Sequence, residues 1–241
     1  MMSSILITGA SRGVGRALAL ACAASGLYSR IILNALHDSP ALKQTARDCA
    51  GAGDALVIPS AGDVGDLGYV ESLRRLAGPV DTLVNNAGIA HIGLLTDMGP
   101  EEWDRLIRTN LTGVFNTCRT FAPDMGRAGG GRILNVSSVW GLVGASCEVA
   151  YSASKGGVNA FTKALARELA PSHVCVNAVA LGMVDTEMNA QLSPEARDEL
   201  RDQIPAGYIA RPEEAAQAIL KLLQMPEYFN GEIVKFDGCW I

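Results

Sequence analysis

The sequence is poor in aromatic residues, which fill 5% of its 241 positions, and its six cysteines lie far apart. It has no Cys-x-x-Cys pair and no neighbouring pair of histidines. A zinc site or a disulfide framework needs closer ligand spacing or a small secreted chain. We therefore expect reduced, mostly buried thiols and no metal.

Concentrated positive charge and long apolar runs are also missing. Twenty basic residues against twenty-five acidic ones give a formal net charge of −5, and no stretch gathers lysine and arginine. This excludes the electrostatic footprint of a nucleic-acid-binding protein. Polar residues interrupt every apolar stretch before the ~18 residues of a membrane span, and the first residues lack a basic leader. We expect a cytoplasmic protein that binds neither membrane nor nucleic acid.

Short apolar runs alternate with amphipathic segments along the whole chain. The runs that we expect to be buried strands are Ser4–Thr8, Ile31–Asn34, Ala55–Ile58, Thr82–Asn85, Arg132–Val136, Val174–Val179 and Glu232–Phe236. The segments with helical periodicity are roughly 14–25, 40–50, 66–77, 101–125, 149–170 and 212–224. Continuous apolar strands alternating with helices predict an α/β fold, with helices on both faces of a doubly wound parallel sheet.

We expect a single domain over residues 1–241, because no linker, repeat or low-complexity tract divides the chain. One segment, Met183–Arg211, lacks a strand pattern and follows the sixth strand, at the edge where such sheets bind ligands. We interpret it as a short helical lid over the substrate; the alternative is a solvated surface insertion.

Glycine is in surplus, with 26 residues in 241, about 11% against roughly 7% in typical proteins. Several of these glycines stand between the first strand and the first helix, in the sequence TGASRGVG. Glycine lets the backbone approach a pyrophosphate closely, and a helix N-terminus offers unpaired N–H groups to the anion. The loop residues predicted to bind a dinucleotide are Gly9, Ser11, Arg12, Gly13, Val14 and Gly15.

The second strand ends at Asn34 without the acidic residue that commonly bonds the ribose of NAD. Arg12 in the neighbouring loop could pair with a 2′-phosphate, which favours NADP over NAD. After the third strand, Asp63 and Val64 are candidates for contacts with the adenine, although Asp63 could equally cap its own loop. After the fourth strand, NNAG can hold the sheet together and let the ribose pass, so Asn86, Ala87 and Gly88 are candidates for cofactor contacts.

A catalytic group is predicted at the start of the helical segment 149–170. Tyr151 and Lys155 are four residues apart and so share a helix face. A nearby ammonium favours the phenolate, which would lower the tyrosine pKa from about 10. Ser138 ends the fifth strand, where it could face Tyr151 and bond a substrate oxygen.

Together these motifs resemble the short-chain dehydrogenase/reductase family over nearly all of the chain. The resemblance rests on TGASRGVG, NNAG, TNLTG, NVSS and Tyr151-x-x-x-Lys155. It implies a seven-stranded sheet with the cofactor across its carboxyl edge, Tyr151 as general acid/base and Ser138 polarising the carbonyl. Lys155 would lower the tyrosine pKa and bind the nicotinamide ribose, and Asn110 would support a proton-returning water chain.

Within the family, the chain is most similar to 3-oxoacyl-carrier-protein reductases, through SRG in the glycine loop and IPA…RPEE at 204–214. The usual Pro-Gly after the sixth strand is Leu181-Gly182 here, and Gly182, Val184 and Thr186 remain candidates for the nicotinamide end. Such reductases tend to bind the carrier protein through arginines at two positions. In this sequence those positions hold Gly129 and Ser172.

These features predict an NADPH-dependent reductase of a small-molecule carbonyl, with a 3-oxoacyl thioester, carrier-bound or not, as one substrate. The alternatives are an alcohol, sugar or hydroxysteroid dehydrogenase, or a nucleotide-sensing regulator without turnover. His91 and Trp140 are candidates for the substrate pocket, although His91 could be a plain surface residue and Trp140 could belong to the core. The resemblance also implies a homotetramer formed through the helical segments 101–125 and 149–170.

Overall fold

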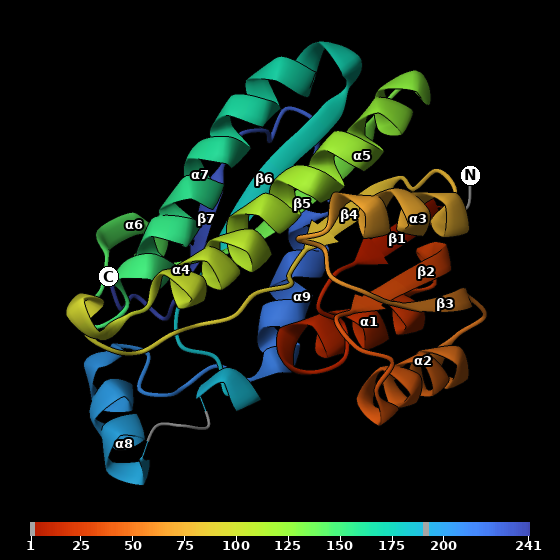
Figure 1. The fold of residues 1–241 in the computed structure, drawn as a ribbon. Coiled ribbons are helices and arrows are strands. Elements are labelled where there is room, and N and C mark those ends of the chain that lie inside the picture. Colours follow the sequence, from red (N-terminus) through yellow and green to blue (C-terminus); the bar gives the residue numbers. More distant parts are fainter. Residues whose placement is uncertain (1–2, 190–192) are drawn as a thin grey trace.

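The computed structural model describes residues 3–189 and 193–241, in which seven strands form one parallel sheet (Figure 1). The strand order is β3-β2-β1-β4-β5-β6-β7. The strands are β1 (Ser3–Ile7), β2 (Tyr28–Ala35), β3 (Leu56–Ala61), β4 (Thr82–Asn85), β5 (Gly131–Ser138), β6 (Val174–Leu181) and β7 (Ile233–Phe236). The predicted doubly wound parallel sheet is confirmed.

Helices cover both faces of this sheet (Figure 1). One face packs against α1 (Gly13–Ser25), α2 (Pro40–Ala52) and α9 (Pro212–Leu222). The other packs against α3 (Leu67–Ala77), α5 (Gly113–Arg127) and α7 (Val149–Leu169). Successive residues of a strand point to opposite faces, so Ile5 and Ile7 enter the first core while Leu6 enters the second. Burial on both faces explains the unbroken apolar strand sequences.

The predicted helix 101–125 is divided into three parts. A helix α4 (Pro100–Ile107) leads into a π-helical turn η2 (Arg108–Thr112), and α5 follows at Gly113. Periodicity does not show this change, because a π turn adds a residue without breaking the run of helical dihedral angles. The turn carries Asn110, one of the predicted catalytic residues.

The described residues of the segment 183–211 form no strand of the main sheet, as predicted. It holds the 3₁₀ turn η4 (Glu187–Asn189) and the helix α8 (Pro194–Gln203), and Val184 forms an isolated bridge with Ala210. Residues 190–192, which fall within the predicted lid, lie outside the described residues. The lid function itself stays a prediction.

The remaining short elements are η1 (Leu95–Asp97), α6 (Trp140–Val143) and η3 (Ala170–Ser172). The sequence did not predict α6, a single helical turn that follows Ser138 directly. The C-terminus lies beside this turn (Figure 1). Across both described ranges, no helix is long and apolar enough to cross a membrane.

Candidate active site

The glycine loop closes against the segment after β4. Gly9 has φ +66°, and a Cβ placed on it would lie 2.8 Å from Cα of Ala87. A Cβ on Gly15 would lie 2.2 Å from the Gly9 carbonyl oxygen and 2.5 Å from Nδ2 of Asn86. Both positions therefore require glycine for contacts within the protein itself, in addition to any contact with a pyrophosphate.

Asn86 and Thr8 hold the two segments together. Asn86 Nδ2 donates hydrogen bonds to the carbonyls of Thr8 and Gly9, both at 3.0 Å. In return, Thr8 Oγ1 accepts from the backbone N–H groups of Asn86 and Ala87, again at 3.0 Å. The Asn86 side chain thus holds the segment after β4 against the glycine loop.

Replacing Gly15 by alanine should therefore damage both the fold and nucleotide binding. We expect the free energy of unfolding to fall by about 2 kcal/mol or more, because the new methyl group overlaps fixed backbone. Thermal denaturation and fluorescence titration with NADPH measure the two effects. Gly51→Ala is the matched control, since a Cβ at this helical position meets nothing within 4 Å. An intact, nucleotide-binding Gly15→Ala protein would contradict this assignment.

Ser138, Tyr151 and Lys155 come together at the carboxyl ends of β5 and β6. Ser138 lies close enough to Tyr151 to lower the pKa of its phenol. Lys155 Nζ lies 5.7 Å from the centroid of the Tyr151 ring and donates to the Val136 carbonyl at 2.8 Å. A Cβ on Gly88 would lie 3.6 Å from this Nζ, so the NNAG segment passes close to the lysine.

The protonation equilibria differ from the sequence-based expectation. The pKa of Tyr151 is raised to about 12: burial is the main cause and the Glu148 carboxylate adds to it, whereas Ser138 acts in the opposite direction. Lys155 is not among the groups that lower this pKa; burial instead depresses the pKa of Lys155 itself to about 8. In this structure Tyr151 is therefore a protonated phenol at neutral pH, suited to donating a proton.

Asn110 is fully buried in the π-helical turn. Its Oδ1 accepts from the N–H of Ile89 and its Nδ2 donates to the Ile89 carbonyl, both at 2.9 Å. Nδ2 also donates to Ser154 Oγ on α7, at 3.1 Å. Asn110 therefore joins the segment after NNAG to the helix that carries Tyr151. The predicted water chain stays a prediction.

The side chain of Asn34, another predicted cofactor residue, points into the protein. It is 1% exposed, and its Nδ2 donates to the Gly62 carbonyl at 3.1 Å and to the Tyr69 hydroxyl at 2.9 Å. These hydrogen bonds of the Asn34 side-chain amide join β2 to the segment after β3 and to α3. The predicted contact of Asn34 with the cofactor stays a prediction.

Asp63 acts as a loop cap, one of the two readings open from the sequence: its Oδ1 accepts from the N–H of Gly65 at 2.8 Å. Val64 is buried behind it against α5, where a Cβ on Gly113 would lie 2.7 Å from Cγ2 of Val64.

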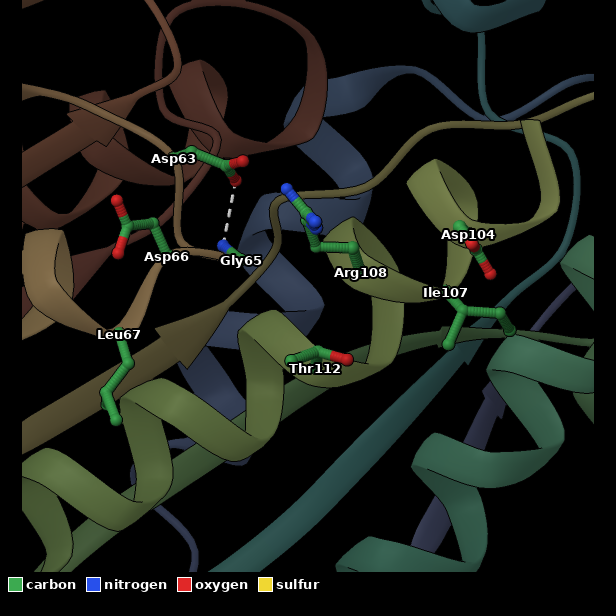
Figure 2. A pocket seen from close by; sticks show the side chains of 8 residues that line it. All are labelled: Asp63, Gly65, Asp66, Leu67, Asp104, Ile107, Arg108 and Thr112. Atoms are coloured by element: carbon green, nitrogen blue, oxygen red, sulfur yellow. Dashed lines mark hydrogen bonds between the residues drawn. The ribbon is translucent and has the colours of Figure 1, made fainter. Parts of the chain in front are cut away.

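Figure 2 shows the adjoining cavity of about 680 Å³, into which Arg108 extends between carboxylates of two segments. Its lining residues are Asp63, Gly65, Asp66, Leu67, Asp104, Ile107, Arg108 and Thr112. Adenine contacts stay a prediction.

The segment after β6 returns to the glycine loop. A Cβ on Gly13 would lie 3.3 Å from Cγ2 of Thr186, which places Thr186 against the start of α1. Val184 is buried. Gly182 is required for a reason that the sequence did not indicate: a Cβ there would lie 2.8 Å from Cα of Asp237.

The other predicted residues occupy different surroundings. Arg12 is exposed at the N-cap of α1, and Ser11 is half-buried beside it. His91 is half-buried, with Nδ1 3.6 Å from a carboxylate oxygen of Glu102. Trp140 lies next to Ser138, one of the predicted catalytic residues, because its backbone N–H donates to Ser138 Oγ at 3.2 Å.

A family model described as short chain dehydrogenase matches residues 3–197. The chain is 36% identical over 241 residues to the uncharacterized oxidoreductase YmfI of Bacillus subtilis (strain 168), covering 100% of this chain and 99% of the relative. It is 37% identical over 240 residues to the 3-oxoacyl-[acyl-carrier-protein] reductase FabG of Aquifex aeolicus (strain VF5), covering 97% and 95%. The solved 3-oxoacyl-[acyl-carrier protein] reductase of Brucella melitensis superposes with a TM-score of 0.91 at 34% identity, covering 99% and 91%.

Proposed function

The chain belongs to the short-chain dehydrogenase/reductase family, and from this premise we propose that it reduces the ketone of a 3-oxoacyl thioester to a secondary alcohol with NADPH. The observation that carries the proposal is that Ser138, Tyr151 and Lys155 come together at the carboxyl edge of the sheet, with Lys155 Nζ 5.7 Å from the centroid of the Tyr151 ring. The relatives named 3-oxoacyl-[acyl-carrier-protein] reductase support the substrate class.

NADPH would supply a hydride to the carbonyl carbon. The protein would bind the nucleotide and supply the groups that act on the substrate oxygen. The loop of Gly9, Gly13 and Gly15 presents the N-terminus of α1, whose free N–H groups suit a pyrophosphate. Gly88 lies beside Lys155 and leaves room for a ribose there. Thr186, against Gly13, is placed to contact the nicotinamide end.

The side chains would act on the substrate oxygen. When hydride reaches the carbonyl carbon, negative charge develops on oxygen and a proton must follow. Tyr151 holds its proton at neutral pH, and the Ser138 hydroxyl beside it can donate a second hydrogen bond to the same oxygen. Lys155 is buried close by and can restore the phenol proton.

Preference for NADPH is proposed from Arg12. Its guanidinium is exposed at the start of α1, and β2 ends without a carboxylate that would repel a 2′-phosphate. Arg12→Ala should raise KM for NADPH about tenfold or more and leave KM for NADH within about twofold, because the charge-assisted bond needs the phosphate. Arg47→Ala, which removes another exposed arginine, is the control. Equal effects on both cofactors would contradict the assignment.

The function is tested by following NADPH oxidation with acetoacetyl thioesters, diketones, sugars and steroids as substrates. We expect the acetoacetyl thioester to give the highest kcat/KM. A clear preference for a sugar or a steroid would overturn the proposed substrate class but leave the hydride-transfer chemistry standing. Nucleotide binding without turnover of any carbonyl would overturn both.

A further inference from the structure

The Ser138 hydroxyl is held by the backbone of the turn that follows it. Its Oγ accepts a hydrogen bond from the Trp140 N–H at 3.2 Å. A serine hydroxyl has one proton to donate and two lone pairs that accept. Because Trp140 engages one lone pair, the hydroxyl proton points away from that N–H and is free for another acceptor. The position of Trp140 therefore sets the direction in which Ser138 can donate.

The turn that carries this N–H is α6, which has only four residues. A single helical turn is unstable by itself, because nucleation fixes several residues for very few hydrogen bonds. The helix α7 supports it through Asn159, whose Nδ2 donates to the Gly141 carbonyl at 2.9 Å. The two backbones also touch, since a Cβ on Gly141 would lie 2.6 Å from the carbonyl carbon of Lys155. The place of α6 therefore depends on its neighbours.

A second support for α6 comes from the C-terminal residues, which lie beside it (Figure 1). The Trp140 ring packs against the Trp240 ring, with centroids 4.8 Å apart and planes tilted by 60°. This separation and tilt are favourable for a pair of aromatic rings. Both tryptophans are half-buried. The indole of Trp240 thus contacts the residue whose N–H holds Ser138.

Trp240 is itself held in a hydrogen-bonded turn. The Asp237 side chain is 6% exposed, and its two oxygens accept from the N–H groups of Cys239 at 3.1 Å and Ile241 at 3.2 Å. The N–H of Trp240 donates to the Asp237 carbonyl at 3.2 Å. These bonds involve the backbone of all three residues after Gly238, so the Trp240 ring is presented to α6 from a defined position.

The predicted lid segment packs on the same C-terminal turn. The N–H of Ala206 donates to the Gly238 carbonyl at 3.1 Å. Gly238 has φ +64°, and a Cβ there would lie 2.8 Å from Cγ2 of Ile204 and 2.9 Å from Cβ of Ala206. The turn that carries Trp240 is therefore in contact with the segment 183–211 as well as with α6.

We infer that Trp240 is a positioning residue for carbonyl reduction, which acts through the Trp140 ring to keep the Trp140 N–H on Ser138 Oγ. The inference rests on the proposed function. Without the indole of Trp240, α6 loses one of its supports, and the Ser138 proton is no longer directed steadily at the substrate oxygen. Small displacements of a catalytic group are costly, because the reacting atoms must be aligned closely. The glycine loop is built from other segments, so nucleotide binding should not change.

A double-mutant cycle between Trp240→Ala and Ser138→Ala tests the inference, with an acetoacetyl thioester and NADPH as substrates. We expect Trp240→Ala to lower kcat about tenfold and to leave both KM values within about threefold. Ser138→Ala should lower kcat about a hundredfold, because it removes a donor to the developing oxyanion. Adding Trp240→Ala to Ser138→Ala should cost less than about twofold more, since the group through which Trp240 acts is already gone.

Two further variants serve as controls. Trp240→Phe keeps an aromatic ring against Trp140 and should retain kcat within about threefold of wild type. Cys239→Ala removes the neighbouring side chain of the same turn, which is exposed, and should leave kcat unchanged. Thermal denaturation shows whether each variant is folded at the assay temperature. If Trp240→Ala is not folded, the same cycle is run with Trp240→Leu, which keeps apolar bulk and removes the ring.

Three results would overturn the inference alone. An unchanged kcat in the Trp240 variant would show that the ring contact has no effect on catalysis. An equal loss of kcat with and without Ser138 would show a general structural role. A raised KM for the thioester at unchanged kcat would make Trp240 a substrate contact instead. Failure of wild type to reduce any carbonyl compound is a separate result, which would reject the proposed function and the inference with it.

Discussion

Replacing Tyr151 by phenylalanine is expected to lower kcat/KM for carbonyl reduction about a thousandfold and to leave NADPH binding within about threefold of wild type. In the proposed mechanism the phenol proton reaches the developing alkoxide, and general acid catalysis by a positioned side chain contributes about 10²–10⁴-fold. The ring, the hydrogen bonds of the glycine loop and the buried Lys155 all remain in the variant. Steady-state kinetics and fluorescence titration with NADPH separate the two effects.

Tyr228→Phe provides the control, because the Tyr228 side chain is fully exposed and its hydroxyl faces solvent. This variant should retain full activity. If Tyr151→Phe kept more than about a tenth of the wild-type rate, the proton would have to come from another group, and Ser138 would be the first candidate.

Lys155→Met is expected to combine a large loss of activity with a gain in stability. Burial lowers the pKa of Lys155 from 10.5 to about 8, so keeping the ammonium charged in the folded protein costs about 3 kcal/mol at neutral pH. Methionine removes that cost. It also leaves the Val136 carbonyl without its hydrogen-bond donor, which offsets about 1–2 kcal/mol of the gain in stability. The net gain should raise Tm by a few degrees. Turnover should fall about a hundredfold or more, because proton supply to Tyr151 is lost.

The stability effect has a defined pH dependence. Below about pH 8 the lysine is charged in both folded and unfolded chains, so the full burial cost applies and the variant has its largest advantage. As the pH rises from about 8 towards 10.5, the folded protein loses the proton first and the advantage shrinks. Denaturation of the apoprotein at pH 7 and pH 10 measures this difference. Lys163→Met, at an exposed position of α7, is the control, and a lower Tm for Lys155→Met at pH 7 would contradict the account.

The parts of the site that follow a strand could be predicted from the sequence. Ser138 ends β5 and NNAG follows β4, and parallel strands bring such residues to one edge of the sheet. Tyr151 and Lys155 lie one helical turn apart, which fixes their relation to one another. In each case local spacing and the sheet topology were sufficient.

Side-chain direction and contacts between distant segments could not be predicted in this way. Asn34 lies at the predicted strand end, yet its amide points to Tyr69. The bonds of Asn110 to Ile89 depend on a π-helical turn that leaves no sequence signal. The packing of Trp140 against Trp240 joins residues one hundred positions apart, and only the folded sheet brings them together.

The most direct measurement follows the hydride itself. Wild-type protein is incubated with an acetoacetyl thioester and NADPH deuterated at the transferring position of the nicotinamide, and the product is analysed by mass spectrometry and NMR. The account predicts one deuterium on the carbon that carried the ketone, and Tyr151→Phe should reduce the rate of its appearance about a thousandfold. A 3-hydroxyacyl product without deuterium at that carbon, or no product at all, would contradict direct hydride transfer at this site.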